Sequence, residues 1–197
     1  SLESNKINMR IISGKLKGSS LYTPKNKNTR PLKDLVRESI FNLLLHSKKI
    51  HFEFEKSNVL DIYAGTGSFG LECISRQSNN VVFIEKDKDA IEILKKNIDK
   101  LNVKKKTKIF NYDIFELIEN KDKINLKFNL IFCDPPYKDK NIQKLITLIY
   151  NRDLLKKNGI IILHRNKSTI EKLPDNFELI DERQYGISKI IFGRLLG

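Results

Sequence analysis

The sequence predicts an α/β fold in which a mostly parallel sheet of seven strands is covered by helices on both faces. From residue 58 onward, short apolar runs alternate with segments of helical spacing, which is typical of a parallel sheet. The last two apolar runs flank Tyr185-Gly186 and predict an antiparallel hairpin at one edge. The chain has 197 residues, of which 40% are apolar, and this is enough for one packed core.

The individual elements follow from local patterns. Two β-prone runs, residues 9–13 and 19–23, surround two glycines and predict an N-terminal hairpin. Apolar residues at helical spacing over 32–45, directly after Pro31, predict a helix, and residues 47–57 indicate a charged linker. The strands predicted for the main sheet are residues 58–62, 81–85, 108–111, 129–133, 159–163, 177–185 and 188–192. The helices predicted between them are residues 68–75, 88–101, 114–119 and 142–150.

The charge balance favours a polyanionic partner. There are 37 Lys and Arg against 24 Asp and Glu, a net charge of +13. Part of this excess is compositional, because 8 Arg and 29 Lys beside abundant Ile and Asn are typical of an AT-rich genome. The cluster at residues 104–108 fits a solvated loop, whereas the basic segment 10–37 is the better candidate for nucleic-acid contact. The candidate RNA-binding residues are Arg10, Lys15, Lys17, Lys25, Lys27, Arg30 and Arg37.

Several classes of protein are disfavoured. No apolar run approaches the roughly 20 residues of a membrane helix, so we expect no membrane association. Cys73 and Cys133 are too few for a disulfide framework or a four-cysteine zinc site, and we expect buried free thiols. His46, His51 and His164 lack metal-ligand spacing, so we expect structural or solvated histidines and no metal.

A glycine turn follows the first strand of the main sheet. Residues 65–70 match G-x-G-x-x-G between a predicted strand and a predicted helix, and Glu85 ends the next strand, where an acid can bind ribose hydroxyls. Asp61 stands just before the turn. A carboxylate there repels a pyrophosphate but can bind an ammonium group, which favours S-adenosylmethionine over NAD. Asp61 could equally cap the glycine loop, and Asp113 could bind an adenine amino group, cap the next helix, or do both.

The tetrapeptide Asp134-Pro135-Pro136-Tyr137 follows the fourth strand. Two prolines remove two amide donors, so the carbonyls of Asp134 and Pro135 can face a cleft. The cleft lies where open α/β sheets bind ligands. A carboxylate and a carbonyl can hold both N–H groups of an exocyclic amine, and Tyr137 offers a ring for stacking a base. The pattern therefore indicates methyl transfer to an amine by alignment, without a covalent enzyme intermediate.

Taken together, these motifs resemble those of class I S-adenosylmethionine-dependent methyltransferases of the exocyclic-amine type. Within that group the chain is similar to the bacterial RsmD family, which methylates guanine N2 in small-subunit ribosomal RNA. The opening residues 9–18, the segment from Arg30-Pro31 to Phe41-Asn42, and Arg183 to Ser188 carry the likeness. The family usually has Thr after Arg-Pro, whereas this chain has Leu32. The resemblance therefore implies no contact from a threonine hydroxyl to the cofactor or to the substrate loop at this position.

The resemblance implies a Rossmann-like core at residues 58–197 that binds S-adenosylmethionine. Residues 9–46 would bind substrate, and residues 1–8 would be an extension or a remnant of expression. The implied cofactor-binding residues are Asp61, Tyr63, Ala64, Gly65, Thr66, Gly67, Glu85, Lys86, Asp113, Ile114 and Asp134. The implied catalytic residues are Asp134, Pro135, Pro136 and Tyr137.

We therefore expect a monomeric, cytoplasmic enzyme that acts on small-subunit rRNA, free or in an assembling 30S-type subunit; an organelle of bacterial descent is the alternative location. Three other functions stay open. The same tetrapeptide type serves adenine-N6 and protein-amide methyltransferases, usually with Asn at its first position. A non-catalytic rRNA-binding assembly factor would bind without turnover. An NAD-dependent oxidoreductase is disfavoured by Asp61 and by the proline pair.

Overall fold

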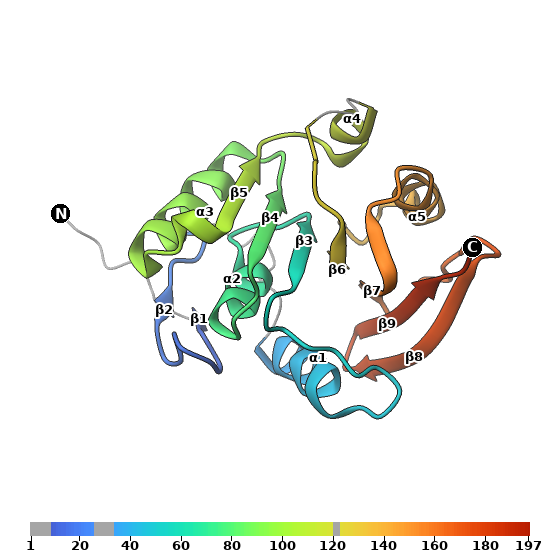
Figure 1. Ribbon diagram of the computed structural model, residues 1–197, viewed down its shortest axis with the longest axis horizontal. Helices are drawn as coiled ribbons and strands as arrows, with labels where there is room; N and C mark the ends of the chain where they lie inside the picture. Colours follow the sequence, from blue (N-terminus) through green and yellow to red (C-terminus); the bar gives the residue numbers. More distant parts are fainter. Residues whose placement is uncertain (1–8, 26–33, 120–122) are drawn as a thin grey trace.

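A seven-stranded sheet in the order β5-β4-β3-β6-β7-β9-β8 runs through the molecule (Figure 1). The computed structural model describes residues 9–25, 34–119 and 123–197. The strands of this sheet are β3 (Asn58–Ile62), β4 (Asn80–Ile84), β5 (Thr107–Phe110), β6 (Phe128–Cys133), β7 (Leu155–Asn166), β8 (Phe177–Tyr185) and β9 (Ser188–Leu195). The helices are α1 (Asp34–His46), α2 (Ser68–Ser75), α3 (Lys88–Leu101), α4 (Ile114–Glu119) and α5 (Ile142–Asn151).

The pairing of the strands confirms the predicted fold class. Strands β5, β4, β3, β6 and β7 are parallel, and β9 pairs antiparallel with both β7 and β8. The chain moves from β3 toward β4 and β5 on one side, then returns to place β6 on the other side of β3. The sheet therefore has its switch point between β3 and β6, where open α/β sheets bind ligands at their carboxyl edge.

Two apolar cores lie on opposite faces of the sheet, because successive residues of a strand point to opposite sides. In β6, Leu130 and Phe132 belong to the core beneath α1, α2 and α3, whereas Ile131 and Cys133 belong to the core beneath α4 and α5. Both cysteines are buried and free, as expected, and burial raises the pKa of each thiol. Among the described residues, no helix is long and apolar enough to cross a membrane.

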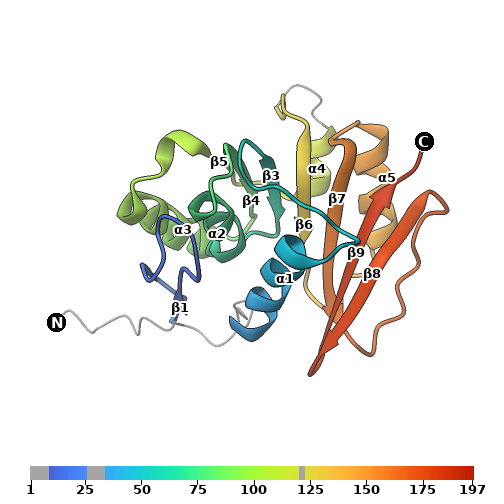
Figure 2. The same ribbon diagram turned by 60° about the horizontal axis from the view of Figure 1, so that its bottom comes forward.

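The N-terminal segment shares the first of these cores and is packed against the sheet's helices (Figure 2). Its hairpin is reduced to two-residue strands, β1 (Met9–Arg10) and β2 (Ser20–Leu21). A column of three rings connects α1 to the sheet: Phe41 stacks on Phe69 at 5.0 Å, and Phe69 stacks on Phe132 at 3.9 Å between centroids. The segment predicted as a charged linker is also anchored, because Ile50 and Phe54 are buried in the same core.

Other boundaries differ modestly from the prediction. Strand β7 begins four residues earlier than residues 159–163 and ends three residues later, because its ends pair with Phe128 of β6 and with Ser188 of β9. Strand β4 ends at Ile84, so Glu85 is the first residue after the strand. The basic cluster near residue 104 contains a short 3₁₀ turn, Lys104–Lys106, whose residues are not buried.

Candidate active site

The glycine turn joins β3 to α2 at the carboxyl edge of the sheet. Gly65 and Gly67 both have positive φ, 57° and 87°, which glycine adopts without a Cβ penalty. A Cβ at Gly67 would lie 2.3 Å from Leu94, whereas nothing lies within 4 Å of a Cβ built on Gly65. Gly67 is therefore required for packing, and Gly65 leaves open space beside the backbone. The turn is closed by the Gly67 amide, which donates to the Ala64 carbonyl at 3.0 Å.

Two carboxylates hold this turn from the neighbouring strand ends. Asp61 accepts a hydrogen bond from the Gly70 amide at 3.1 Å, in the first turn of α2. Glu85 accepts from the Gly65 amide and from the Asp87 amide, both at 2.9 Å. Asp61 thus caps the glycine loop, one of the two roles expected for it, and Glu85 orders the same turn.

The electrostatics of the site favour a cationic ligand. Asp61 is 1% exposed, and burial raises the pKa of its carboxyl well above the ordinary value. The neighbouring charges of Asp134 and Glu85 raise that pKa further, while the Gly70 hydrogen bond lowers it. The negative charges of Asp134 and Glu85 beside the buried Asp61 therefore favour a bound positive charge and oppose a pyrophosphate.

Most of the remaining candidate cofactor-binding residues line a pocket beside the turn. Its lining comes from the ends of β3, β4 and β5 and from the start of α4: Ile62, Tyr63, Ile84, Glu85, Lys86, Tyr112, Asp113 and Ile114. Asp113 accepts a hydrogen bond from the Phe115 amide at 2.9 Å, so it caps α4 while also lining the pocket. Burial is the largest cause of a raised pKa at Tyr63, whose φ of 60° turns the chain away from the strand.

The tetrapeptide leaves β6 next to the glycine turn. The Asp134 amide donates to the Ile62 carbonyl at 3.4 Å, which ties the start of the tetrapeptide to the end of β3. Pro135 is buried, whereas Pro136 and Tyr137 are exposed, Tyr137 by 58%. A carboxylate and an exposed ring thus stand close together in sequence at the switch point of the sheet.

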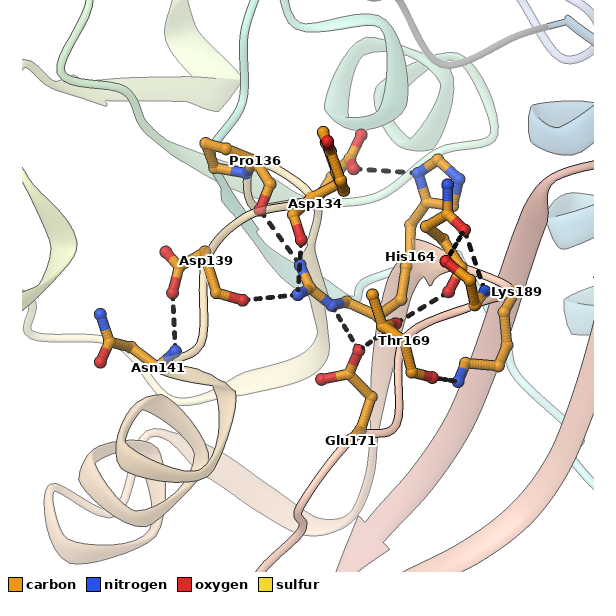
Figure 3. A network of polar contacts seen from close by, with 12 residues as sticks. Asp134, Pro136, Asp139, Asn141, His164, Thr169, Glu171 and Lys189 are labelled. Atoms are coloured by element: carbon orange, nitrogen blue, oxygen red, sulfur yellow. Dashed lines mark hydrogen bonds and ion pairs between the residues drawn. The ribbon is translucent and has the colours of Figure 1, made fainter.

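Two consecutive residues of β7 hold the tetrapeptide, and neither role was predicted from the sequence. His164 Nδ1 lies 2.9 Å from Asp134 Oδ1 (Figure 3). The buried Arg165 donates to three carbonyls of the following turn, those of Pro136, Tyr137 and Asp139, at 3.3, 3.4 and 2.6 Å. Glu171 pairs with Arg165 at 2.7 Å. His164 was expected to be structural or solvated, and its contact with Asp134 gives it a structural role at the tetrapeptide.

Five of the seven predicted RNA contacts lie in the part of the chain that the structure describes, and one of the five is buried. Lys27, Arg30 and Leu32 lie outside the described residues, and Arg10, Lys15, Lys17 and Lys25 are exposed. The Lys15 amide donates to the carbonyl of Ser75, the last residue of α2. Because α2 starts at the glycine turn and eight residues span about 12 Å, Lys15 lies at the far end of this helix from the site.

Arg37 requires a correction, because it is 1% exposed and cannot reach RNA at the surface in this conformation. Its Nη2 donates to the carbonyl of Arg10 at 2.5 Å and lies 3.4 Å from Asp34. Burial lowers the pKa of the guanidinium. Arg37 therefore connects α1 to β1.

Asn97 is a further residue that was not singled out from the sequence. Its side chain is fully buried in α3. The amide donates to the carbonyls of Thr66 and Tyr22 at 3.0 and 3.1 Å, and its oxygen accepts from the Tyr22 amide at 2.7 Å. The glycine turn and the segment directly after β2 are thus held by one side chain. A polar residue on the apolar face of a helix was the available sequence signal.

Comparison with known proteins identifies the family of the chain. A family model described as "Conserved hypothetical protein 95" matches residues 9–194. The chain is 32% identical to Ribosomal RNA small subunit methyltransferase D of Haemophilus influenzae, over 91% of this chain and 90% of that protein. It is 35% identical to the protein of the same name from Buchnera aphidicola subsp. Acyrthosiphon pisum, over 88% of this chain and 86% of the relative.

Solved structures agree with the sequence relatives. The crystal structure of the "putative methylase HI0767" from Haemophilus influenzae superposes with a TM-score of 0.74 at 30% identity, covering 95% of this chain and 98% of that one. A structure described as "SMU.776, a putative methyltransferase complexed with SAH" shares the fold alone, with a TM-score of 0.62 at 14% identity over 77% of this chain and 48% of that one. The fold is thus that of class I methyltransferases. The chain therefore belongs to the family described as Conserved hypothetical protein 95, the RsmD family that its motifs indicated.

Proposed function

We propose that the chain transfers a methyl group from S-adenosylmethionine to the exocyclic N2 of a guanine in small-subunit ribosomal RNA. The single observation that carries this proposal is the juxtaposition of Asp134 and Tyr137 with the glycine turn at one edge of the sheet. The family relatives named for small-subunit rRNA support the substrate class. We further propose that the protein acts in the cytoplasm as a monomer and that residues 9–46 contribute to RNA binding.

The residues of the site fit the cofactor. Open space beside Gly65 allows a ligand to approach the backbone, and the pocket that Tyr63, Lys86, Asp113 and Ile114 line would hold the adenosine part. Glu85 would accept from the ribose hydroxyls, and Asp61 would face the amino group of the methionine part. The bound cofactor supplies an electrophilic methyl group on a sulfonium.

The chain's own residues align the amine. The Asp134 carboxylate and the carbonyl of Pro135 accept from the two N–H groups of guanine N2, and Tyr137 stacks on the base. The amine lone pair then forms the nitrogen–carbon bond. S-adenosylmethionine held there would supply the methyl group and keep the electron pair of the carbon–sulfur bond, and the methylated amine would release one proton. Asp134 is the nearest acceptor for that proton, so no further base is required.

The first test is transfer of labelled methyl to small-subunit rRNA, offered naked and as partly assembled subunits that lack the modification. We expect N2-methylguanosine after nuclease digestion and nucleoside mass analysis. Label on adenine would move the protein to the N6 enzymes, and label on protein would move it to the amide enzymes. RNA binding without label would indicate an assembly factor.

The Asp134→Ala variant tests the role of the carboxylate within that function. Loss of one preorganised hydrogen-bonding partner should lower kcat by at least about 100-fold. Affinity for S-adenosylhomocysteine, measured by calorimetry, should stay within a few fold, because Asp134 serves mainly the amine. Undiminished methyl transfer by this variant would remove the carboxylate from the reaction.

A further inference from the structure

Two strand ends meet beside the carboxylate that we assign to the amine. Cys133 of β6 pairs with Leu163 of β7 in parallel register, so the next residues, Asp134 and His164, are neighbours. Their side chains are in contact, with 2.9 Å between His164 Nδ1 and Asp134 Oδ1 (Figure 3). The side chains are 19% and 26% exposed, so water screens this contact only in part.

The second imidazole nitrogen is also engaged. His164 Nε2 lies 2.8 Å from Ser188 Oγ, and Ser188 is 8% exposed. Ser188 pairs with Asn166 across the antiparallel β7–β9 ladder, which places it diagonal to His164 on the same face of the sheet. The imidazole is thus fixed at both nitrogens, by the residue that follows β6 and by the first residue of β9.

The chemistry of the partners sets the direction of these hydrogen bonds. An ionised carboxylate only accepts, so Nδ1 of His164 must carry the proton. In the neutral imidazole, Nε2 then accepts from the Ser188 hydroxyl. One oxygen of Asp134 is occupied by this donor, and the other oxygen of the same carboxylate is left to accept from an amine.

We propose that His164 is a positioning residue for methyl transfer: through Nδ1–H it fixes the rotamer of the Asp134 carboxylate, so that one oxygen faces the substrate amine. Ser188 supports the imidazole from the other side. This role rests on the proposed function, because it concerns the same amine. A carboxylate without this donor rotates about its side-chain bonds, and the amine then meets the acceptor in a fraction of encounters.

A matched pair of variants separates the two imidazole nitrogens. The amide nitrogen of Asn can take the place of Nδ1, whereas that of Gln takes the place of Nε2. We expect His164→Asn to keep kcat within about 10-fold and His164→Gln to lose about 100-fold, since small misplacements cost rates of that order. The KM for RNA and the affinity for S-adenosylhomocysteine should change little in both variants. His46→Asn, on the exposed end of α1, is the control.

A second measurement is independent of turnover. With three histidines in the chain, nitrogen NMR of the imidazoles can be assigned by comparison with the His46→Asn and His164→Asn proteins. We expect a proton on Nδ1 of His164 in the wild-type chain. We also expect the His164 signals to shift in Asp134→Ala, because their acceptor has gone.

The outcomes distinguish the two proposals. A wild-type protein that methylates no RNA overturns the proposed function and the assigned role with it. An active wild type whose Gln and Asn variants have equal kcat overturns the role of His164 alone, and so does a neutral imidazole protonated only on Nε2. A higher KM for RNA with an unchanged kcat would likewise contradict positioning at the reacting amine.

Discussion

At the scale of single residues, Asp61 is 1% exposed and stands near two further carboxylates, Glu85 and Asp134. Burial and these neighbours raise the pKa of the Asp61 carboxyl above its ordinary value of 3.8. The folded chain therefore holds a proton on Asp61 more firmly than the unfolded chain does. As the pH rises from about 4 through the folded-state pKa, this residue's contribution to the free energy of unfolding is progressively lost.

The Asp61→Asn variant should remove that loss. The Asn oxygen can still accept from the Gly70 amide, and no charge is buried. We expect a melting temperature a few degrees above wild type at neutral pH, since about 1 kcal/mol shifts Tm by roughly 2–4 °C in a chain of this size. The advantage should shrink toward pH 4. Thermal unfolding of both proteins from pH 4 to 8, without cofactor, measures the difference.

The affinity of the Asp61→Asn variant for S-adenosylhomocysteine should decrease, although its stability increases. If Asp61 faces the methionine amino group, the Asn variant loses a charge-assisted interaction of about 1.5–3 kcal/mol, which weakens S-adenosylhomocysteine binding by about 10- to 150-fold. Higher stability together with weaker binding would mean that Asp61 lowers the stability of the fold but contributes to ligand binding. Identical pH profiles of stability in the two proteins would contradict the buried charge.

At the scale of elements, helix α2 fastens the N-terminal segment to the core. Glu72 accepts from the amides of Ile12 and Ser13 at 2.9 and 3.0 Å. Ser75 Oγ accepts from the Leu16 amide at 2.9 Å and donates to the Ser13 carbonyl at 2.6 Å. The turn between β1 and β2 thus obtains its partners from a helix about 60 residues later in the chain, so the two segments should unfold together.

Gly14 and Gly18 test this attachment as a matched pair. Both have positive φ, 87° and 83°. A Cβ on Gly14 would lie 2.0 Å from the Ser75 carbonyl oxygen, whereas nothing lies within 4 Å of a Cβ on Gly18. Gly18→Ala should lose about 1–2 kcal/mol from left-handed strain alone. Gly14→Ala should lose clearly more, because α2 must also move away.

Chemical denaturation of both variants gives the comparison, with the free energy of unfolding and the m-value fitted for each. Equal losses would mean that the turn adjusts without disturbing α2. A lower m-value for Gly14→Ala would instead indicate that residues 9–25 have detached in the native state.

The sequence predicted the helices and strands better than the contacts between them. Alternating apolar runs located each strand of the main sheet to within a few residues, because burial on two faces leaves a local pattern. The length of the N-terminal hairpin strands was overestimated, since the amides of Ile12, Ser13 and Leu16 donate to Glu72 and Ser75 and not across the hairpin. Those interactions depend on long-range packing that no local window contains.

At the scale of the whole molecule, the site is made by neighbouring strand ends. The sequence placed Asp61, Glu85 and Asp134 correctly at such ends, and the strand order brings them together. His164 also follows an apolar run directly, and that was its available signal. Its role required the register of β7 against both β6 and β9. Arg37 was expected to face the substrate cleft and contact RNA, but it is buried between α1 and β1.

The same edge of the sheet carries an exposed basic group that we call the edge lysines: Lys138, Lys140 and Lys167. The first two follow Tyr137, and the third follows β7, the strand whose His164 and Arg165 contact the tetrapeptide. The lysines of the 3₁₀ turn, Lys104–Lys106, lie instead at the start of β5, at the opposite edge of the sheet. Because each group carries three charges, replacing either one by Gln takes the net charge from +13 to +10.

The two triple variants therefore separate local RNA binding from total charge. Replacing the edge lysines by Gln should weaken rRNA binding and flatten the slope of log K against log salt, by roughly 0.7–0.9 for each phosphate that is no longer neutralised. Replacing Lys104–Lys106 should leave the slope nearly unchanged. Titrations from 50 to 200 mM salt measure both, with S-adenosylhomocysteine affinity as the check on folding. Equal slopes for the two variants would mean that RNA responds to the net charge of the molecule and does not lie along the active-site edge.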